Sequence, residues 1–295
     1  MIVVFGSINL DLIFTVPRIP APGETVLGPA TRIEPGGKGA NQAVAAARDG
    51  GRVIMAGAVG TDSLASGALA LLQAAGVDLS RVRTVSASTG CAAIVVDPAG
   101  NNAIAVGSGA NLAVVASQVE DAALGPATTL VLQMEVPAAE TAALIARARA
   151  AGSRIVLNLA PALSLPDAAL RAVDLLVVNE TEGAWLAAEQ GCAASAVALR
   201  DALGGVSVVL TRGAAGADVA DPAGAWREPA MAVQAVDTTA AGDCFVGVLA
   251  HRLDRGEPLR QAVQRASRAA ALCCTRPGSQ GSIPAAAETD AFARA

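Results

Sequence analysis

The sequence predicts an α/β protein in which helices flank both faces of a central, mostly parallel sheet and a small β-sheet forms a lid. Short apolar runs alternate with longer Ala-rich helical patterns along most of the chain. This alternation is typical of βαβ units. Two stretches rich in turn residues interrupt it without a helical crossover, and they predict the lid. The 295 residues, 53% of them hydrophobic, are enough to bury a large core.

The core elements follow one another in this alternating order. Strands are expected where short apolar runs end at turn or polar residues, at 2–5, 53–58, 129–133, 154–159, 175–178 and 206–211. Helices are expected at 40–48, 63–75, 138–151, 180–189, 194–203, 242–253 and 259–274. The α/β core would therefore comprise residues 1–10, 36–88 and 108–295.

The two interruptions predict short strands. Residues 11–34 are broken by Pro17, Pro20, Pro22 and Gly23, and residues 91–106 form a hairpin pattern that turns at 97–101. The two segments could pair into one small sheet that stands on the core as a lid, with bounds 11–35 and 89–107. The alternative is two unrelated surface hairpins.

Composition argues against several classes of protein. The net charge is -5 and the sequence has no long basic run, so a nucleic-acid-binding surface is not expected. Aromatic residues make up only 2% of the chain, which leaves few rings for stacking on bases. The five cysteines form no C-x-x-C pair, and the single histidine, His251, fits an ordinary helix position. Without a signal-peptide pattern or a long apolar run, the chain is expected to be soluble, cytoplasmic and without a membrane partner.

The most informative stretch is Asp237-Thr238-Thr239-Ala240-Ala241-Gly242-Asp243, which runs directly into a helical pattern. Its small residues let the backbone approach a ligand, and the first N–H groups of a helix can face an anion. Asp243 would repel a phosphate, so it fits better as a base that takes a proton from an attacking hydroxyl. The amides of Ala241 and Gly242 would then stabilise the transferring group. The alternative is that Asp243 is an N-cap.

Lys38 is the only lysine, and it lies in Gly36-Gly37-Lys38-Gly39-Ala40-Asn41-Gln42. A compact cation between glycines at a helix start suggests close contact with a ligand. The segment is not a P-loop, because Gly39 follows Lys38, and the residues after Gly6 do not form a dinucleotide fingerprint.

Polar side chains follow several of the expected strands. Asn9, Asp11 and Glu135 come after strand ends, where open α/β sheets bind ligands. Together with Lys38 and Asn41 they offer donors and acceptors suited to a small polyhydroxylated molecule.

Two further segments fit a nucleotide with its magnesium ion. Asn179-Glu180-Thr181-Glu182 follows a strand and opens a helix, which either Asn179 or Thr181 could cap. Glu182 could order water around magnesium beside the phosphates. The loop 211–216 is built of small residues and could lie against a nucleotide or form a plain turn.

Taken in order, these segments resemble the ribokinase family of sugar and nucleoside kinases. The resemblance extends from Gly6-Ser7-Ile8-Asn9 to Thr275-Arg276-Pro277-Gly278-Ser279-Gln280. It rests most on Gly-Gly-Lys-Gly-Ala-Asn and Asp-Thr-x-Ala-Ala-Gly-Asp, which lie about 200 residues apart. It implies a ribokinase-like fold and ATP-dependent phosphorylation of the 5-hydroxyl of D-ribose, in a homodimer formed through the lid. Two alternatives are a family kinase acting on another sugar or a nucleoside, and an inactive sugar or nucleotide sensor. A nicotinamide-linked dehydrogenase would share the α/β rhythm, but the glycine fingerprint is missing.

The resemblance also implies roles for individual positions. The sugar would be held by Asn9, Asp11, Gly37, Lys38, Asn41 and Glu135, with Asp243 as the base. The anion hole corresponds to Ala240, Ala241 and Gly242. ATP would lie against Asn179, Gly242, Ser267 and the loop Thr211, Arg212, Gly213, Ala214, Ala215 and Gly216, with Glu182 acting on magnesium through water. A monovalent cation, expected to be K⁺, would be bound by Asp237, Thr239, Cys273, Arg276, Gly278 and Ser282.

Two positions depart from the family pattern. Cys244 stands where Thr is common after the base, and Ser267 stands where a larger polar residue often touches adenine. The first should leave the chemistry intact because its side chain points into the helix. The second concerns the detail of the nucleotide contact.

Overall fold

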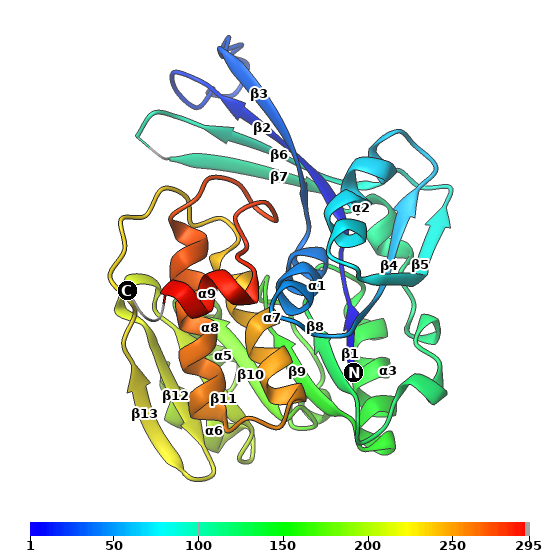
Figure 1. Ribbon diagram of the computed structural model, residues 1–295, viewed down its shortest axis with the longest axis vertical. Coiled ribbons are helices and arrows are strands. Elements are labelled where there is room, and N and C mark those ends of the chain that lie inside the picture. Colours follow the sequence, from blue (N-terminus) through cyan, green and yellow to red (C-terminus); the bar gives the residue numbers. More distant parts are fainter. Residues whose placement is uncertain (100, 293–295) are drawn as a thin grey trace.

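The computed structural model, which describes residues 1–99 and 101–292, contains a large sheet between two layers of helices and a smaller sheet that projects from it (Figure 1). Within the described residues the large sheet has nine strands in the order β13-β12-β11-β10-β9-β8-β1-β4-β5. The strands from β11 to β5 are parallel to their neighbours, whereas β12 and β13 are antiparallel at one edge. The expected mostly parallel sheet is thereby confirmed.

The strands of this sheet have the bounds β1 (Ile2–Phe5), β4 (Val53–Gly60), β5 (Asp78–Val85), β8 (Thr129–Leu132), β9 (Arg154–Asn158), β10 (Leu175–Asn179), β11 (Ser207–Thr211), β12 (Ala217–Asp221) and β13 (Gly224–Glu228). All six expected strands are present, with ends that differ by at most two residues. The pattern did not predict β5, β12 and β13. β5 and β13 are the edge strands, and β12 lies next to β13 and mixes buried with half-buried residues, so none of the three needs the continuous apolar run of a buried strand.

The helices cover the two faces of the large sheet. Their bounds are α1 (Lys38–Arg48), α2 (Leu64–Ala74), α3 (Ala138–Ala151), α4 (Asp167–Leu170), α5 (Glu180–Glu189), α6 (Ala196–Ala202), α7 (Ala241–Asp254), α8 (Leu259–Cys274) and α9 (Ala286–Phe292). Short 3₁₀ turns are η1 (Gly109–Ala113), η2 (Ala116–Gln118), η3 (Asp121–Ala123) and η4 (Gly213–Ala215). The bounds of α1, α2, α6 and α7 differ from the expected ranges by one or two residues at an end. The helices α4 and α9 were not predicted.

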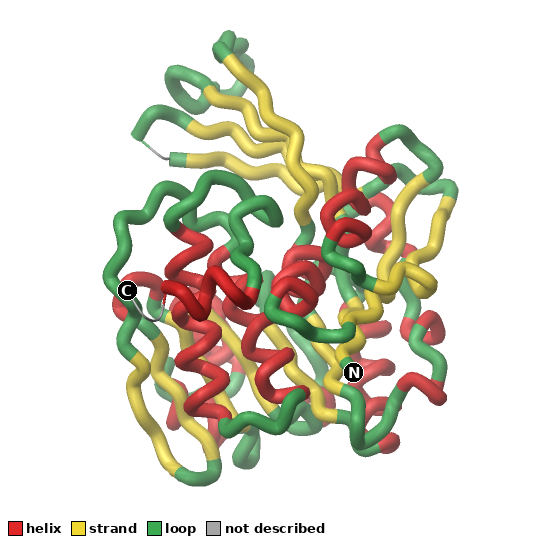
Figure 2. Tube along the Cα trace, in the orientation of Figure 1, coloured by secondary structure: helices red, strands yellow, loops and turns green. Residues whose placement is uncertain are grey.

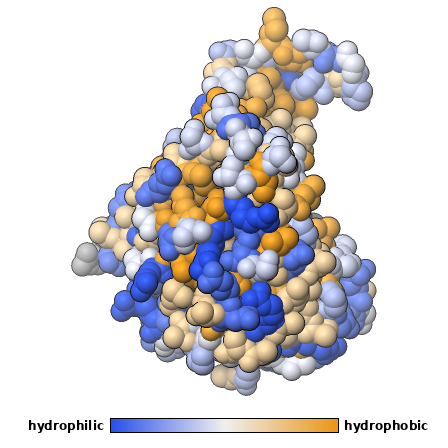
Figure 3. Space-filling model, turned by 90° about the vertical axis from the view of Figure 1, so that its right-hand side faces the viewer, coloured by the Kyte–Doolittle hydropathy of each residue, from blue (hydrophilic) through white to orange (hydrophobic). Residues whose placement is uncertain are grey.

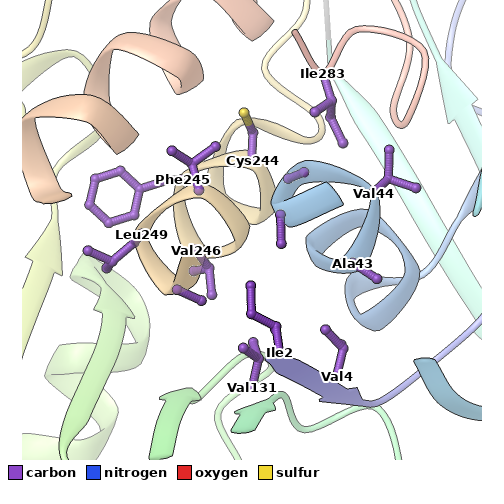
Figure 4. Close-up of a cluster of buried hydrophobic side chains, with 14 of the residues drawn as sticks. Ile2, Val4, Ala43, Val44, Val131, Cys244, Phe245, Val246, Leu249 and Ile283 are labelled. Atoms are coloured by element: carbon purple, nitrogen blue, oxygen red, sulfur yellow. The ribbon is translucent and has the colours of Figure 1, made fainter. Parts of the chain in front are cut away.

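The hydrophobic core has two halves, one on each face of the sheet. Ile2 and Val4 of β1 pack toward α1 and α7, together with residues of α2 and α8 (Figure 4). Val3 and Phe5 point the opposite way, into the cluster formed with α3 to α6. Successive strand residues face opposite sides, so a strand covered on both sides must be apolar throughout.

The smaller sheet is built from the two segments that lack helices. It comprises β2 (Asn9–Thr15), β3 (Ala30–Gly36), β6 (Gly90–Val96) and β7 (Asn102–Gly107), in the order β3-β2-β6-β7. Figure 2 shows these strands extending away from the helical body. The two segments therefore pair in one sheet, and the alternative of two unrelated hairpins is wrong. Gly100, in the expected turn 97–101, lies outside the described residues.

His251 lies in α7 and hydrogen-bonds to a buried carboxylate at the end of α1. Its Nδ1 is 2.8 Å from Asp49 Oδ2. Arg252 Nε donates to the same oxygen at 2.6 Å, and Arg265 Nη2 donates to Asp49 Oδ1 at 3.0 Å. This cluster ties α1, α7 and α8 together on the side of the sheet that carries Lys38 and Asp243.

In the part of the chain that the structure describes, no helix is both long and apolar enough for a membrane crossing.

Candidate active site

A small cavity lies at the carboxyl ends of β9, β10 and β11, beside the first turn of α7. Its volume is about 90 Å³, and its lining includes Lys38, Asn179, Glu182, Thr211, Gly242 and Asp243. Parallel α/β sheets bind ligands at this edge because the loops that follow the strands meet there. These six residues come from segments up to 205 positions apart, from Lys38 to Asp243, and the fold brings them together.

A larger open depression of about 680 Å³ lies elsewhere, between η2 and α3. Its lining contains none of the expected site residues, and its Arg147 is paired with Asp121. The smaller cavity is therefore the better candidate for chemistry.

Asp243 is held by two side-chain amides. Asn41 Nδ2 donates to its Oδ2 at 2.8 Å, and Gln42 Nε2 donates to its Oδ1 at 2.9 Å. The N-cap of α7 is Ala240, and Asp243 is the third residue of the helix, so the interpretation of Asp243 as an N-cap is wrong. Only 7% of Asp243 is exposed, and its carboxylate is both buried and at the wall of the cavity.

Lys38 supplies the positive charge of the cavity. Its pKa is raised above the ordinary lysine value, first by the negative charge of Asp243 and further by Glu135 and Glu182. Its ammonium therefore stays charged at neutral pH, where a developing negative charge would attract it.

The first turn of α7 places Ala240, Ala241 and Gly242 beside Asp243. Gly242 lines the cavity. The amide of Ala241 donates to the carbonyl of Thr238 at 3.2 Å, so it must share or exchange that bond in order to receive an anion. The turn thus offers main-chain donors at the same place as the buried carboxylate.

Glu135 is anchored by two donors. Its Oε2 accepts a hydrogen bond from Ser7 Oγ at 2.6 Å and another from the Lys38 amide at 3.0 Å. Gly37 precedes Lys38 with a φ of +88°, and a Cβ there would lie 2.9 Å from the Asn9 amide nitrogen. Only glycine therefore allows this close approach of α1 to β2.

Asn9 is fixed by Asn111, whose Nδ2 donates to Asn9 Oδ1 at 2.7 Å. Asn111 also accepts from the Ile8 amide at 2.9 Å through its Oδ1. Sequence reasoning missed both Ser7 and Asn111. Ser7 lies inside the Gly6–Asn9 segment and could have been noticed there, but Asn111 carries no local signal.

Several buried side-chain oxygens lack a hydrogen-bond partner among the described residues. Two of them, Asp11 Oδ1 and Asn41 Oδ1, belong to residues expected to bind the sugar. Burial, followed by repulsion from Glu135, Glu34 and Asp243, raises the pKa of Asp11 to about 7. Buried polar atoms are almost always paired, so hydroxyl donors of a bound ligand would satisfy these acceptors.

Asn179 and Glu182 form a reciprocal cap at the start of α5. Asn179 Oδ1 accepts from the Glu182 amide at 2.8 Å, and Glu182 Oε2 accepts from the Asn179 amide at 2.8 Å. Of the two expected caps, Asn179 is correct and Thr181 is not. Burial raises the pKa of Glu182 above the ordinary value.

The expected nucleotide residues are only partly gathered around the cavity. Thr211 lines it, and the following residues form η4. Arg212 is paired with Asp218 at 2.5 Å and with Glu180 at 3.2 Å, so its guanidinium is held by the protein. Ser267 lies on α8, half-buried, and is not part of the cavity lining.

The expected cation residues lie on two segments joined by Asp237. Its Oδ1 accepts from the Thr239 amide at 2.9 Å, and its Oδ2 accepts from the Gly278 amide at 3.0 Å. Burial acts to raise the pKa of Asp237, but these hydrogen bonds outweigh it and lower the pKa. Cys273 Sγ lies 3.0 Å from Ser282 Oγ, whereas Arg276 turns outward to Glu288 at 2.7 Å.

Within residues 1–99 and 101–292, no group of three or more His, Cys, Asp or Glu side chains is arranged to hold a metal. A cation near Asp237 would therefore depend on backbone carbonyls around a single carboxylate.

Residues 1–286 match the family described as pfkB family carbohydrate kinase. The chain belongs to this family. A ribokinase of Haemophilus influenzae is 38% identical, over 98% of this chain and 97% of the relative. A deoxyribokinase of Salmonella typhimurium is 35% identical, over 96% of this chain and 95% of the relative. The structure of Arabidopsis thaliana ribokinase complexed with ribose and ATP superimposes with a TM-score of 0.87 at 27% identity, covering 99% of this chain and 97% of the other.

The chain is therefore a carbohydrate kinase of the pfkB family with a ribokinase-like fold. The first turn of α7, the lysine side chain and the Asp243 carboxylate lie together at its cavity, and phosphoryl transfer depends on positioned donors and charges of this kind. Cys244 is fully buried behind Asp243 and contacts Cys273, so this departure from the family pattern lies away from the cavity.

Proposed function

We propose that the chain transfers the terminal phosphoryl group of ATP to the 5-hydroxyl of D-ribose and releases D-ribose 5-phosphate and ADP. The observation that carries this proposal is the setting of Asp243. Asp243 belongs to the first turn of α7 and adjoins buried polar side chains that include two acceptors without a partner among the described residues, Asp11 Oδ1 and Asn41 Oδ1. A small molecule with several hydroxyls would satisfy those acceptors and present one hydroxyl to Asp243.

In the proposed mechanism Asp243 orients the acceptor hydroxyl and takes its proton as the oxygen attacks phosphorus. The side-chain amides of Asn41 and Gln42 hold the carboxylate in place for this step. Lys38 and the main-chain amides of Ala241 and Gly242 stabilise the charge on the transferring group. Positioning and charge stabilisation provide most of the catalysis of phosphoryl transfer.

Glu182 and Asp237 fit the expected ions. Glu182 is half-buried at the cavity wall, on the side of Asn179 and Thr211, where it could order the water shell of Mg²⁺ next to the nucleotide. Asp237 accepts hydrogen bonds from the amides of Thr239 and Gly278. It thereby joins the two segments that carry the residues expected to bind K⁺. When bound, Mg²⁺ would supply charge neutralisation on the phosphates.

We further propose that residues 11–35 and 89–107 act as a lid over the sugar and that the enzyme acts in the cytoplasm. Asp11 and Asn9 support the first point because they lie on β2 of the small sheet and belong to the polar group near Asp243. A moving sheet that carries sugar ligands would exclude water when the sugar binds.

Measuring ADP release with D-ribose, 2-deoxy-D-ribose, hexoses and nucleosides tests the substrate. D-Ribose is expected to give the highest kcat/KM, because a sugar that lacks a hydroxyl leaves a buried acceptor unpaired. Relative to 2-deoxy-D-ribose the preference should be roughly 100-fold or more. A higher kcat/KM for deoxyribose or a nucleoside would assign the chain to that activity instead, and no turnover with any acceptor would support a sensor.

Turnover is expected to rise severalfold when K⁺ is added to a buffer free of K⁺ and Na⁺. The bound cation would hold the segment around Asp237 and the segment around Gly278 in place next to the first turn of α7. The Asp237→Asn variant should require more K⁺ for half-maximal activation, and the readout is kcat as a function of K⁺ concentration. A flat response in the wild-type protein would remove the cation from the proposal.

The protein is expected to be a dimer formed through the lid. The strand edges of β3 and β7 are unpaired in the sheet order, and Ile33, Ile104 and Val106 are 62%, 56% and 53% exposed. Figure 3 shows the lid projecting from the body with apolar side chains on its surface. Exposed apolar strands of this kind favour pairing with another chain.

Light scattering tests this expectation on the wild type and on two matched variants. Ile104→Lys should shift the mass toward the monomer, whereas Leu163→Lys, at a position 45% exposed outside the lid, should leave it unchanged. A wild-type protein that is monomeric at working concentration would contradict the dimer.

A further inference from the structure

A row of buried amide side chains contacts Asp243, and two of its members, Gln42 and Gln133, are absent from the lining of the cavity, whereas Asn158 lines it. Gln42 and Gln133 are 0% exposed. Gln133 Nε2 donates to Gln42 Oε1 at 2.6 Å, and Gln42 Nε2 donates to Asp243 Oδ1 at 2.9 Å. Gln42 Nε2 also donates to Asn158 Oδ1 at 3.0 Å, and Asn158 Nδ2 donates to the carbonyl of Val177 at 3.2 Å.

The direction of every hydrogen bond in this row is determined by Asp243. An ionised carboxylate can only accept, so Gln42 must present its nitrogen. The oxygen of Gln42 then needs a donor, and Gln133 supplies one. The alternative orientation of Gln42 would place two oxygens against each other in a buried site, which is costly. The row therefore holds Gln42 in a single orientation.

The backbone leaves room for this arrangement. A Cβ on Gly6 would lie 1.9 Å from Gln133 Oε1. Gln133 directly follows β8, and glycine at position 6 leaves the space that its side chain needs to reach Gln42 in α1. The row thus begins at the centre of the sheet, passes through α1 and ends at the carboxylate on α7.

We propose that Gln42 is a positioning residue for the base: held by Gln133 and Asn158, it fixes the plane of the Asp243 carboxylate that takes the proton of the acceptor hydroxyl. Gln42 does not need to touch sugar or ATP for this role. Gln42 and Asn41 both donate a hydrogen bond to this carboxylate, so the proton must arrive on a lone pair that neither amide uses. The hydrogen bond from Gln42 thereby determines how the Asp243 carboxylate is oriented toward the acceptor hydroxyl.

This inference rests on the proposed role of Asp243 in a kinase, but not on the identity of the sugar. If the wild-type enzyme phosphorylates another polyol instead of D-ribose, the same experiment is performed with that polyol. The ionisable groups that interact electrostatically with Asp243 include Lys38, Asp11, Glu182 and Cys273, and the variants alter none of them.

The test compares Gln42→Met and Gln42→Glu with the control Gln118→Met. Gln118 is a partly buried glutamine whose Nε2 donates to the carbonyls of Gly57 and Arg81, in a region remote from the cavity. Steady-state kinetics with saturating ATP give kcat and KM for the sugar as a function of pH, and thermal unfolding reports the stability of each variant.

Gln42→Met is expected to lower kcat roughly 10- to 100-fold with KM for the sugar changed less than about threefold, because a misplaced reacting group costs turnover rather than binding. In Gln42→Glu, two carboxyl groups would share one proton beside each other. The acid limb of the kcat profile should therefore move to higher pH by about one unit or more. Gln118→Met should change neither kcat nor the pH profile, whatever it does to stability.

If Gln42→Met does not fold, Gln133→Met replaces it. Gln133→Met removes only the donor that fixes Gln42, and it should lower kcat by a smaller factor with an unchanged KM. A kcat of either folded methionine variant within about twofold of wild type would overturn the inference. So would a rise in KM at constant kcat, or an unshifted acid limb in Gln42→Glu.

Discussion

The Asp243→Asn variant is expected to keep its affinity for D-ribose and to lose turnover by about 10²- to 10⁴-fold, the usual effect of removing a general base. Asparagine has nearly the same shape, so the space around the sugar is preserved. However, it cannot take the proton of the acceptor hydroxyl. The change should therefore appear in kcat, measured by ADP release, and not in the dissociation constant of ribose, measured by calorimetry.

A matched control uses the same substitution where the carboxylate is exposed. Asp121 is paired only with Arg147 on the surface, with an 87% exposed side chain, and Asp121→Asn should leave kcat unchanged. A turnover near that of the wild type in Asp243→Asn would show that another group takes the proton.

The Asp49→Asn variant is expected to lose about 3–5 kcal/mol of the free energy of unfolding, the usual effect of removing one partner from a buried ion pair. The side chain of Asp49 is 2% exposed, and it is the shared acceptor of Arg252 and Arg265, whose side chains are 17% and 11% exposed. Without the carboxylate, two largely buried guanidinium groups would keep their charge and lose the buried negative charge that they share, while Arg252 would retain Glu257 and Arg265 would retain Asp290. Urea unfolding measures the effect.

The same cluster predicts how stability depends on pH. Burial acts to raise the pKa of Asp49, but the hydrogen bonds from His251, Arg252 and Arg265 outweigh it, so the pKa is lowered in the folded state. The cluster therefore stabilises the fold fully above the ordinary aspartate pKa of 3.8, and this contribution is lost as pH falls through the lower folded value. Asp49→Asn should accordingly lose less stability than the wild type on acidification.

Asp290→Asn serves as the control for this prediction. Asp290 also pairs with Arg265, but its side chain is 55% exposed. Surface ion pairs contribute about 0–1 kcal/mol, so this variant should unfold close to the wild-type urea concentration. An equal loss in Asp290→Asn and Asp49→Asn would contradict the special role given to the buried carboxylate.

Local patterns were sufficient to predict the elements on which the site depends. The strands β1, β8 and β10 are buried on both faces, so their continuous apolar runs stand out in the sequence. The lid could be predicted because turn residues interrupt the regular alternation. In contrast, β5 lies at an edge of the sheet and alternates between exposed and half-buried residues. Its polar composition does not give the apolar run from which a strand is predicted.

The residues that hold the site in place could not be found in the same way. Asp243 and Lys38 stand in short segments whose composition indicates a ligand. Gln42 is next to Asn41 in the sequence, but its partners Gln133 and Asn158 are 91 and 116 positions away. Such contacts exist only once the sheet has formed, so a local sequence pattern does not predict them.

The most direct test of the account is a structure with D-ribose and a nonhydrolysable ATP analogue bound. It should place an Asp243 carboxylate oxygen about 2.6–3.2 Å from the 5-hydroxyl oxygen of the sugar, with the terminal phosphate at the first turn of α7. An Asp243 side chain that points away from the sugar, or a phosphate bound far from that turn, would contradict the central claim that one turn of the chain supplies both the proton acceptor and the anion site.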